Sequence, residues 1–471
     1  MRANTSRLAG DAVLLARTSK IFQYALDLLW KEQNDLLPLV KCMPLDLWET
    51  EEQPTLKFVG LRRPVRASDL DRLLFYSHRV KLFVVHEDMN VAVDGLRTCL
   101  AGQVLFPNLM ALVWGRPEGF CSDLPLFLSP KIQHLGLALQ DSPPHLEFLS
   151  TLTLRYPVLK SVDINLPPSA STTSGVSDAV CSLRAVTRLT VNTLTVPALL
   201  HLAGLQDLTV FNLLSVGDVC VPDTLPDERF ADLAHLSVGA NSIEQCTALV
   251  RFFSAAPLST GFLALSGVDP SPASAWATFA SALRDHCAHP ALRSLFVYHG
   301  SIPLPPDSPP RPTGAALRPL FAFPHLVSVV LEPPDGFDLD AALLHDMARA
   351  WPALEKLALG VSASNAGPRI SLPALLPFAL HCPKLQTLGF VLDATASLDA
   401  ELAELDGGHC SLRRLLLGQS AITEGDVAGV ARFLVRVFPG LVDVVCTQGH
   451  PVTEVWRRVV EEMGQSRKES D

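Results

Sequence analysis

The densest group of metal-binding residue types in this sequence is His286-Cys287-Ala288-His289. A spacing of three residues would place the two histidines on one side of a helix, and imidazole and thiolate are ligands that zinc prefers. A structural zinc site needs four ligands, however, and no second His/Cys cluster lies nearby in the sequence. Pro290 would end such a helix, and histidines in a last turn interact favourably with the helix dipole. The pattern therefore favours a polar helix end, and we predict no metal site.

Residues that could perform catalysis are equally sparse. The sequence contains no G-x-S-x-G, H-E-x-x-H, Walker A or G-x-G-x-x-G motif. His86, Glu87 and Asp88 could move protons, but no nucleophile stands beside them, and we expect a polar loop after a strand. The carboxylate pairs Asp338/Asp340 and Glu461/Glu462 are expected to be charges at a helix start and in the tail. We predict no catalytic residue, no cofactor and no enzymatic activity.

Composition limits the class of protein. The chain has 471 residues, of which 48% are hydrophobic and 18% charged, enough to build a large core and too apolar for a disordered chain. A net charge of −10 provides no protein-wide positive field for nucleic acid. One local basic stretch is expected to be a solvated face; it contains Arg62, Arg63, Arg66, Arg72, Arg79 and Lys81.

The ten cysteines are single and form no C-x-x-C pair, which favours reduced, buried thiols. The N-terminus does not lead into the apolar segment of a secretory signal, and no uncharged apolar run approaches the roughly 18 residues of a membrane span. The sequence therefore predicts a cytoplasmic or nuclear protein without a membrane partner.

One short unit recurs along the chain: an apolar helix followed by Pro-x-Leu-x-x-Leu-x-Leu, with the proline missing from some copies. The last two apolar residues alternate, as on one face of a strand, and the proline ends the preceding helix. The steps between copies are usually roughly 27 to 31 residues, at the long end of leucine-rich repeats. In chain order, the apolar triplets are Val80/Phe83/Val85, Leu109/Leu112/Trp114, Ile132/Leu135/Leu137, Leu159/Val162/Ile164, Val186/Leu189/Val191, Leu205/Leu208/Val210, Leu233/Leu236/Val238, a degraded Leu263/Leu265, Leu292/Leu295/Val297, Leu326/Val329/Leu331, Leu354/Leu357/Leu359, Leu385/Leu388/Phe390, Leu412/Leu415/Leu417 and Leu441/Val444/Cys446.

Helices are expected between these strands over 338–350, 276–287 and from Asp426 onward, because apolar residues recur there at helical spacing. No unit can bury its apolar face alone, so neighbouring units must stack. A doubly wound sheet could contain the same junctions, but a dozen copies exceed what such sheets hold. We predict an α/β, leucine-rich-repeat-like solenoid of about 12 to 14 irregular repeats. No consistent asparagine follows the strands, so we expect no uniform asparagine ladder.

The first fifty residues differ from the repeats. Residues 15–22 (LARTSKIF) and 25–31 (ALDLLWK) resemble the second half of an F-box, with Ser19, Lys20 and Phe22 filling its first part and Leu29, Trp30 and Lys31 its second. Residues 35–40, 43–49, Arg63-Pro64-Val65 and 72–76 are similar to the continuation found in the fungal, basidiomycete-type F-box/leucine-rich-repeat family. The specific part of this resemblance covers about residues 11 to 85.

The resemblance implies a Skp-type adaptor of a cullin–RING ubiquitin ligase as partner. The possible adaptor-contact residues are Leu15, Ser19, Lys20, Phe22, Leu29 and Trp30. The family's opening Leu-Pro-x-Glu stretch does not precede them, which leaves two alternatives: a truncated product, or an array that lost its docking half. Without an adaptor, the same residues would form a helical cap over the first repeat.

The predicted organisation has three parts. Residues 1–56 form a partial F-box-like helical segment, 57–460 the solenoid and 461–471 a frayed tail. A proline-rich loop is expected over 302–319, and a Ser/Thr/Pro-rich loop open to phosphorylation over 167–178.

We predict a protein–protein interaction module, as substrate receptor of an SCF-type ubiquitin ligase, that binds an unknown protein client. A repeat scaffold without ligase coupling is the alternative. An enzyme of an unrecognised type would need a deep pocket lined by convergent polar groups.

Overall fold

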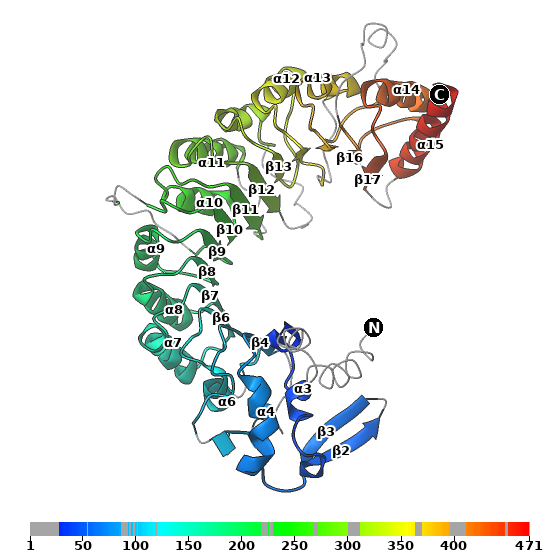
Figure 1. The fold of residues 1–471 in the computed structure, drawn as a ribbon. Helices are drawn as coiled ribbons and strands as arrows, with labels where there is room; N and C mark the ends of the chain where they lie inside the picture. The colour runs from blue at the N-terminus through cyan, green and yellow to red at the C-terminus, as the bar shows by residue number, and fades with distance from the viewer. Residues whose placement is uncertain are drawn as a thin grey trace. The chain divides into compact units, whose positions relative to one another are not determined.

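The computed structural model describes residues 28–53, 55–85, 93, 96–97, 99–100, 102–117, 120–217, 225, 229–266, 272–299, 311–362, 370–395, 411–447 and 451–470. The chain divides into an N-terminal unit, Met1–Ala198, and a C-terminal unit, Leu199–Asp471. In each unit, short parallel strands alternate with helices or 3-10 turns (η), and the strands pair in chain order (Figure 1).

The N-terminal unit contains a parallel array in the order β1-β4-β5-β6-β7-β8 and a separate antiparallel hairpin of β2 and β3. Its elements are β1 (Glu32–Gln33), α3 (Leu37–Val40), η2 (Leu45–Leu47), β2 (Trp48–Gln53), β3 (Thr55–Leu61), η3 (Ala67–Leu70), α4 (Asp71–Ser77), β4 (Leu82–Val85), β5 (Ala111–Trp114), α6 (Phe120–Phe127), β6 (His134–Ala138), α7 (Pro143–Arg155), β7 (Ser161–Asn165), α8 (Ala170–Ser182) and β8 (Arg188–Val191). The helix α9 (Val196–Ala203) contains the boundary between the units.

The C-terminal unit contains the parallel array β9 to β17. Its elements are β9 (Val210–Leu213), β10 (His235–Ala240), α10 (Ile243–Val250), β11 (Thr260–Leu265), α11 (Ala273–His286), β12 (Ser294–His299), η4 (Gly314–Ala322), β13 (Ser328–Glu332), α12 (Ala341–Ala350), β14 (Lys356–Leu359), η5 (Leu372–Leu375), α13 (Leu376–His381), β15 (Thr387–Gly389), β16 (Arg414–Gly418), η7 (Glu424–Asp426), α14 (Val427–Val437), β17 (Asp443–Cys446) and α15 (Val452–Ser470).

The predicted class, an α/β leucine-rich-repeat-like solenoid, is confirmed by these arrays. Apart from the two-residue β1, the described residues contain fourteen array strands, β4–β8 and β9–β17, in agreement with the predicted repeat number. In-out alternation along the strands is also as expected: in β12, Leu295 and Val297 are buried, whereas Phe296 and Tyr298 between and after them are more exposed. The alternating residues that the repeat pattern identified therefore form the core between strands and helices.

The prolines end helices in the way the sequence predicts. Tyr156, Trp351, Cys382 and Phe438 follow the last turns of α7, α12, α13 and α14, each directly before a proline. Their φ angles lie between −131° and −118° and their ψ angles between 63° and 73°, outside the helical region. A following proline disfavours helical backbone by steric clash, so the chain leaves the helix here and turns into the next strand.

One repeat was assigned to the wrong residues. The sequence pattern placed Leu205, Leu208 and Val210 in the core, but Leu205 and Val210 are only half-buried. The buried triplet lies three residues later, at Leu208, Phe211 and Leu213, on strand β9. Both triplets satisfy the same apolar spacing, because Leu208 can serve as either their first or their second member.

The predicted helical segment 1–56 is partly wrong. Residues 1–27 lie outside the described part of the chain, and residues 37–40 and 45–47 are short helical turns as expected. Trp48 begins a hairpin, however, and this hairpin runs past the predicted boundary to Leu61. β1 adds a strand to the array by pairing in parallel with β4, so the segment covers the first repeat through backbone pairing as well.

Two predicted loops are helical in part. Residues 302–310 of the proline-rich loop lie outside the described residues, but Gly314–Ala322 forms a 3-10 helix whose Ala316, Leu317 and Leu320 are buried. Most of the Ser/Thr-rich stretch 167–178 belongs to α8, because Ser169 accepts the backbone N–H of Thr172 and starts the helix as an N-cap. In both stretches one side of the helix is buried, by Leu317 and Leu320 in the first and by Thr172 and Val176 in the second, which favours helix over the loop that composition indicated.

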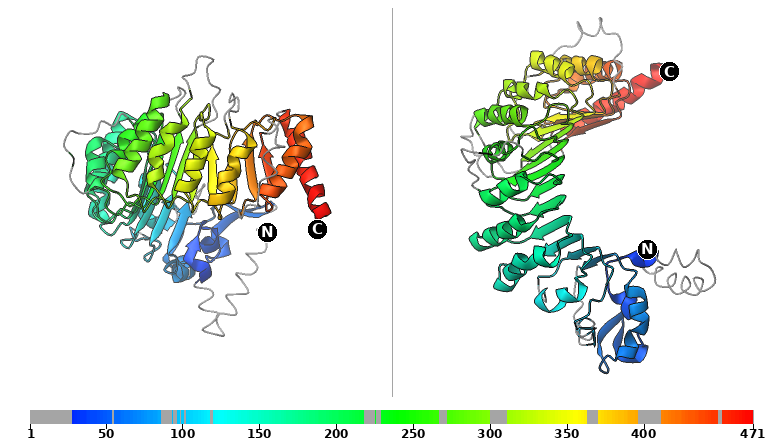
Figure 2. Two further views of the ribbon diagram at one scale, coloured as in Figure 1. Left: turned by 90° about the horizontal axis from the view of Figure 1, so that it is seen from above. Right: turned by 60° about the vertical axis from the view of Figure 1, so that its left-hand side comes forward.

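The predicted frayed tail is also wrong. The helix α15 continues to Ser470 and lies against α14 and β17 (Figure 2). Trp456, Val459 and Met463 are buried, so this helix covers the last repeat. A terminal repeat needs such a cap because its apolar face has no further neighbour.

No regular asparagine ladder was expected, but the side chains of Asn192 and Ser420 each accept a backbone N–H of the preceding repeat, as the residues of such a ladder would. Asn192 follows β8, and its Oδ1 accepts the backbone N–H of Leu166 in the preceding repeat at 2.8 Å. Ser420 follows β16, and its Oγ accepts the N–H of Leu392 in the preceding repeat at 2.9 Å. These bonds satisfy backbone donors that the strand ladder leaves unpaired.

Candidate functional site

The predicted polar helix end at His286–His289 is confirmed. A ring nitrogen of His286 lies 3.1 Å from the carbonyl oxygen of Phe253, and one of His289 lies 2.7 Å from that of Arg284. Cys287 is buried, which raises the pKa of its thiol to about 12. No group of three or more metal-binding side chains occurs in the described part of the chain.

Two of the carboxylates singled out in the sequence, Asp340 and Glu461, have structural contacts. Asp340 is the N-cap of α12 and accepts the N–H of Leu343 at 2.7 Å. Glu461 forms an ion pair with Arg457 one turn earlier on α15. His86, Glu87 and Asp88 lie outside the described residues.

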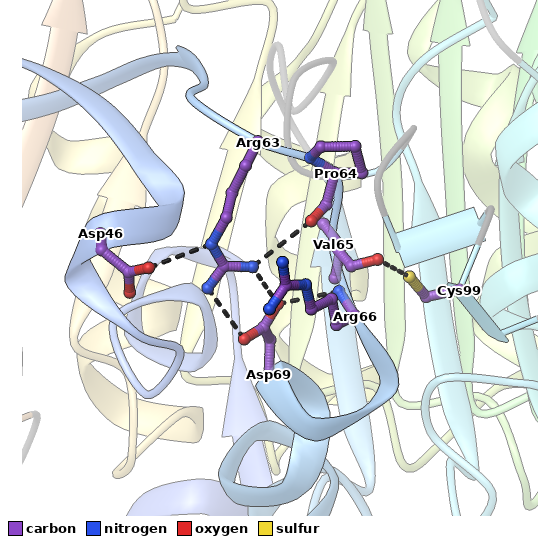
Figure 3. Close-up of polar contacts among 7 residues, drawn as sticks. All are labelled: Asp46, Arg63, Pro64, Val65, Arg66, Asp69 and Cys99. Carbon is purple, nitrogen blue, oxygen red and sulfur yellow. Dashed lines mark hydrogen bonds and ion pairs between the residues drawn. The ribbon is translucent and has the colours of Figure 1, made fainter.

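Within the N-terminal unit, Arg63 of the basic stretch is the centre of a polar cluster (Figure 3). Its guanidinium donates to Asp46 at 3.0 Å and to both carboxylate oxygens of Asp69, at 2.6 and 3.0 Å. The backbone N–H of Arg66 also donates to Asp69, at 2.8 Å. Arg63, followed by the N–H of Arg66, lowers the pKa of Asp69 to about 2. These bonds join η2, the end of the hairpin and η3, which is a structural role.

Replacing Asp69 by asparagine should lower the urea midpoint of unfolding at pH 7. Because the pKa of Asp69 is about 2 in the folded chain and about 4 in an unfolded one, its stabilising contribution is complete above pH 4. It is lost as the pH falls from about 4 towards 2. The difference in urea midpoint between the wild-type chain and Asp69→Asn should therefore be constant above about pH 4 and shrink as the pH falls towards about 2. Circular dichroism at each pH measures this.

The matched control is Asp46→Asn, since Asp46 contacts the same guanidinium through an exposed carboxylate. Its effect should be smaller at every pH. Equal effects of the two variants, or a difference that does not change with pH, would contradict the assigned role of Asp69.

Two of the six possible adaptor-contact residues lie within the described part of the chain. Leu15, Ser19, Lys20 and Phe22 fall outside it. Trp30 is buried and stacks on Tyr76 of α4, with ring centroids 4.7 Å apart. Leu29 beside it is 59% exposed. Trp30 thus anchors residues 28–31 against α4, whereas Leu29 is available for another contact.

The C-terminal unit presents a second kind of surface. Its helices lie along one face of the strand array, and we call the opposite face the open face (Figures 1 and 2). Residues on this face align in rows because the parallel strands pair in register. The middle row from β9 to β14 contains Asn212, Ser237, Phe262, Phe296, Val330 and Ala358.

Three aromatic side chains gather on the open face at β11 and β12, and we call them the aromatic cluster: Phe262, Phe296 and Tyr298. The ring centroids of Phe262 and Tyr298 are 5.5 Å apart, and Phe296 lies 6.4 Å from each. Phe262 is 39% and Tyr298 36% exposed. Their neighbours in register are Ser237 and Ala264 on one side and Val330 and Glu332 on the other. The three rings therefore form an aromatic group among non-aromatic neighbours.

A buried carboxylate lies at the margin of this cluster. Glu332 of β13 is directly opposite Tyr298 in the strand register and only 8% exposed. Its Oε2 accepts the N–H of Ser362 at 2.9 Å. Burial, the largest influence, raises the pKa of Glu332, and the donors from Ser362 and Val361 and the charge of Lys356 oppose that rise. Burial of a charged carboxylate disfavours folding, and the donors from the 361–362 turn offset part of that cost.

The aromatic cluster was not predicted from the sequence. A usable signal was present, because the non-core positions of the strands carry mostly small or polar residues, and aromatic rings fill them only in β11 and β12 among the array strands described. The repeated leucines, by contrast, indicate only the core.

Comparisons with known proteins add little. No protein-family model matches the chain, and no curated protein sequence matches it. Among solved structures, the crystal structure of a TLR13–ssRNA13 complex is similar, with a TM-score of 0.37 and 15% sequence identity over 79% of this chain and 50% of that one. The chain thus spans about half the length of that protein. A likeness so distant carries no conclusion about ligands. None of the helices in the described residues has the length and apolarity of a membrane span.

Proposed function

We propose that this chain is a non-catalytic module that binds a partner protein through the open face of its C-terminal unit. The aromatic cluster carries this proposal: Phe262 and Tyr298 are each more than one-third exposed and in contact with one another. Aromatic residues are enriched among the few residues that dominate protein interfaces. Repeat arrays use extended surfaces of this kind for binding.

Site-specific photo-cross-linking in the native cell tests this proposal. A benzophenone side chain at Ser294, on β12 of the open face, should yield a discrete protein adduct. One at Leu380, an exposed residue of helix α13, should not. Adding Phe262→Ala and Tyr298→Ala should reduce the Ser294 adduct by more than about thirtyfold, as expected for two interface residues that dominate binding.

The thermal unfolding of the double variant should be close to that of the wild-type chain, because both rings are partly solvated in the native state. An adduct that forms equally from Leu380, or that persists without the two rings, would refute binding through the open face.

We also propose the ligase-receptor role that the F-box resemblance implies. The observation in its favour is local: Leu28 and Leu29 are exposed beside the buried Trp30, so the segment presents apolar side chains while remaining anchored. The full chain should bind a purified Skp-type adaptor, and Leu28→Ser with Leu29→Ser should weaken that binding at least about tenfold, by loss of apolar contact.

Leu154→Ser, at an even more exposed leucine on α7, is the control and should leave adaptor binding unchanged. Failure of the wild-type chain to bind the adaptor would exclude ligase coupling and leave the scaffold alternative. Calorimetry provides the measurement in each case.

A further inference from the structure

We propose that the aromatic cluster and Glu332 together recognise an arginine side chain in an exposed segment of the partner protein. This inference deepens the proposed binding function and rests on it. Three properties of the site support a planar cation as its ligand: the ring faces, the neighbouring negative charge and register neighbours that are not basic.

The rings provide the first part of the site. Aromatic faces carry the negative end of a quadrupole and attract cations that approach within about 6 Å of a ring centroid. Phe262 and Tyr298 leave surface open to such an approach. A guanidinium is planar and weakly hydrated, so it stacks on a ring at lower desolvation cost than the strongly hydrated lysine ammonium.

Glu332 provides the charge. It is paired in register with Tyr298 on the adjacent strand, and its side chain is buried, so its field acts through a medium that screens less than water. The N–H of Ser362 at 2.9 Å holds the carboxylate in place. A carboxylate has about four acceptor positions, so the donors of the 361–362 turn leave capacity for attraction to a further cation.

The surroundings argue against a nucleic acid as ligand. Bases also stack on aromatic rings, but their phosphates need basic side chains. The register neighbours of the three rings are Ser237, Ala264, Val330 and Glu332, none of them basic. Lys356 lies on β14 opposite Ser328, and its charge acts on Glu332, so it competes with an incoming cation.

The test uses the full chain and four pools of seven-residue peptides on beads, with randomised flanks and a fixed central arginine, lysine, citrulline or leucine. Citrulline preserves the shape of arginine without its charge. The arginine pool should retain about tenfold more protein than the citrulline pool, as expected for a cation on an aromatic face. Phe262→Ala or Tyr298→Ala should abolish the difference.

Glu332→Gln should bring retention on the arginine pool close to the citrulline level while retention on the leucine pool stays unchanged. Lys356→Met should increase retention on the arginine pool, because a competing cation is removed. Val445→Ser is the matched control: Val445 is an exposed residue of β17 on the same row, and its replacement should change nothing.

Equal retention on the arginine and citrulline pools would overturn the inference. If the Ser294 cross-link still required Phe262 and Tyr298, binding through the open face would stand without recognition of arginine. If neither the cross-link nor the retention on the arginine pool required the two rings, both proposals would be refuted. Single-stranded RNA that binds through the rings and ignores Glu332→Gln would also refute recognition of arginine.

Discussion

Replacing Trp456 by alanine should lower the free energy of unfolding of the C-terminal repeats by about 3–5 kcal/mol, the usual effect of truncating a fully buried tryptophan. The side chain is 1% exposed, and its Nε1–H donates to the carbonyl oxygen of Ser420 at 3.1 Å. Ser420 in turn holds the preceding repeat through the N–H of Leu392. The substitution therefore leaves a cavity and loosens the contact between α15 and the last repeats.

The location of the effect tests the capping role more sharply than its size. Repeats contact mainly their neighbours, so the loss of a cap should act at the nearest end of the array. Amide hydrogen exchange should accelerate in β16 and β17, with little change in β10 to β12. Arg458→Ala, a substitution on the same helix as Trp456, removes an exposed ion pair with Glu424 of η7 and should leave both regions unchanged. A Trp456→Ala chain with wild-type exchange throughout would disprove the cap.

The repeat pattern predicts the core well because the core repeats the same physical requirement. Each unit needs apolar residues that alternate on a strand and an interruption of the preceding helix, so the leucine spacing and the proline identify both. Strand β11 illustrates this: only Leu263 and Leu265 matched the pattern, yet both are buried, together with Leu258. Strand β9 shows the limit, since two overlapping triplets share Leu208 and only packing decides between them.

The ends were harder to predict because they are not repeats. In α15, Val452, Trp456, Val459 and Met463 follow helical spacing, but neighbouring charges such as Glu461 and Glu462 suggested a solvated tail. The hairpin of β2 and β3 contains Glu49, Glu51 and Glu52, residues that favour strands poorly. For α15, contacts with α14 and β17 decide the structure, and composition alone indicated something else.

The aromatic cluster and Glu332 could not be predicted from the sequence for a related reason. Phe262 and Tyr298 add nothing to the periodic pattern because they occupy the strand positions that alternate with the buried core residues. Whether these residues form a site depends on the strand register, which places Phe262 beside Phe296 and Tyr298 beside Glu332. Residues about 34 positions apart in the sequence thus become neighbours only once the repeats are stacked.

Replacing Gly360 by alanine should lower the free energy of unfolding by about 2–5 kcal/mol, from left-handed backbone and a steric clash together. Gly360 has φ of +61°, and a Cβ there would lie 2.5 Å from the Cα of Gly336 in the preceding repeat. The backbone fixes the position of the added Cβ, and the atom that it meets is also backbone, so no side-chain rotation can relieve the clash.

Gly429→Ala is the matched control, because that glycine lies inside α14 with nothing within 4 Å of an added Cβ. This substitution should raise the free energy of unfolding by about 0.5–1 kcal/mol. Changes of opposite sign in the free energy of unfolding, measured by urea denaturation, would separate the strain at Gly360 from the general effect of replacing glycine.

Gly360→Ala should also weaken binding at the open face, since displacing the 360–362 turn moves the Ser362 N–H that holds Glu332. Unchanged stability would show that this close approach does not constrain the two repeats.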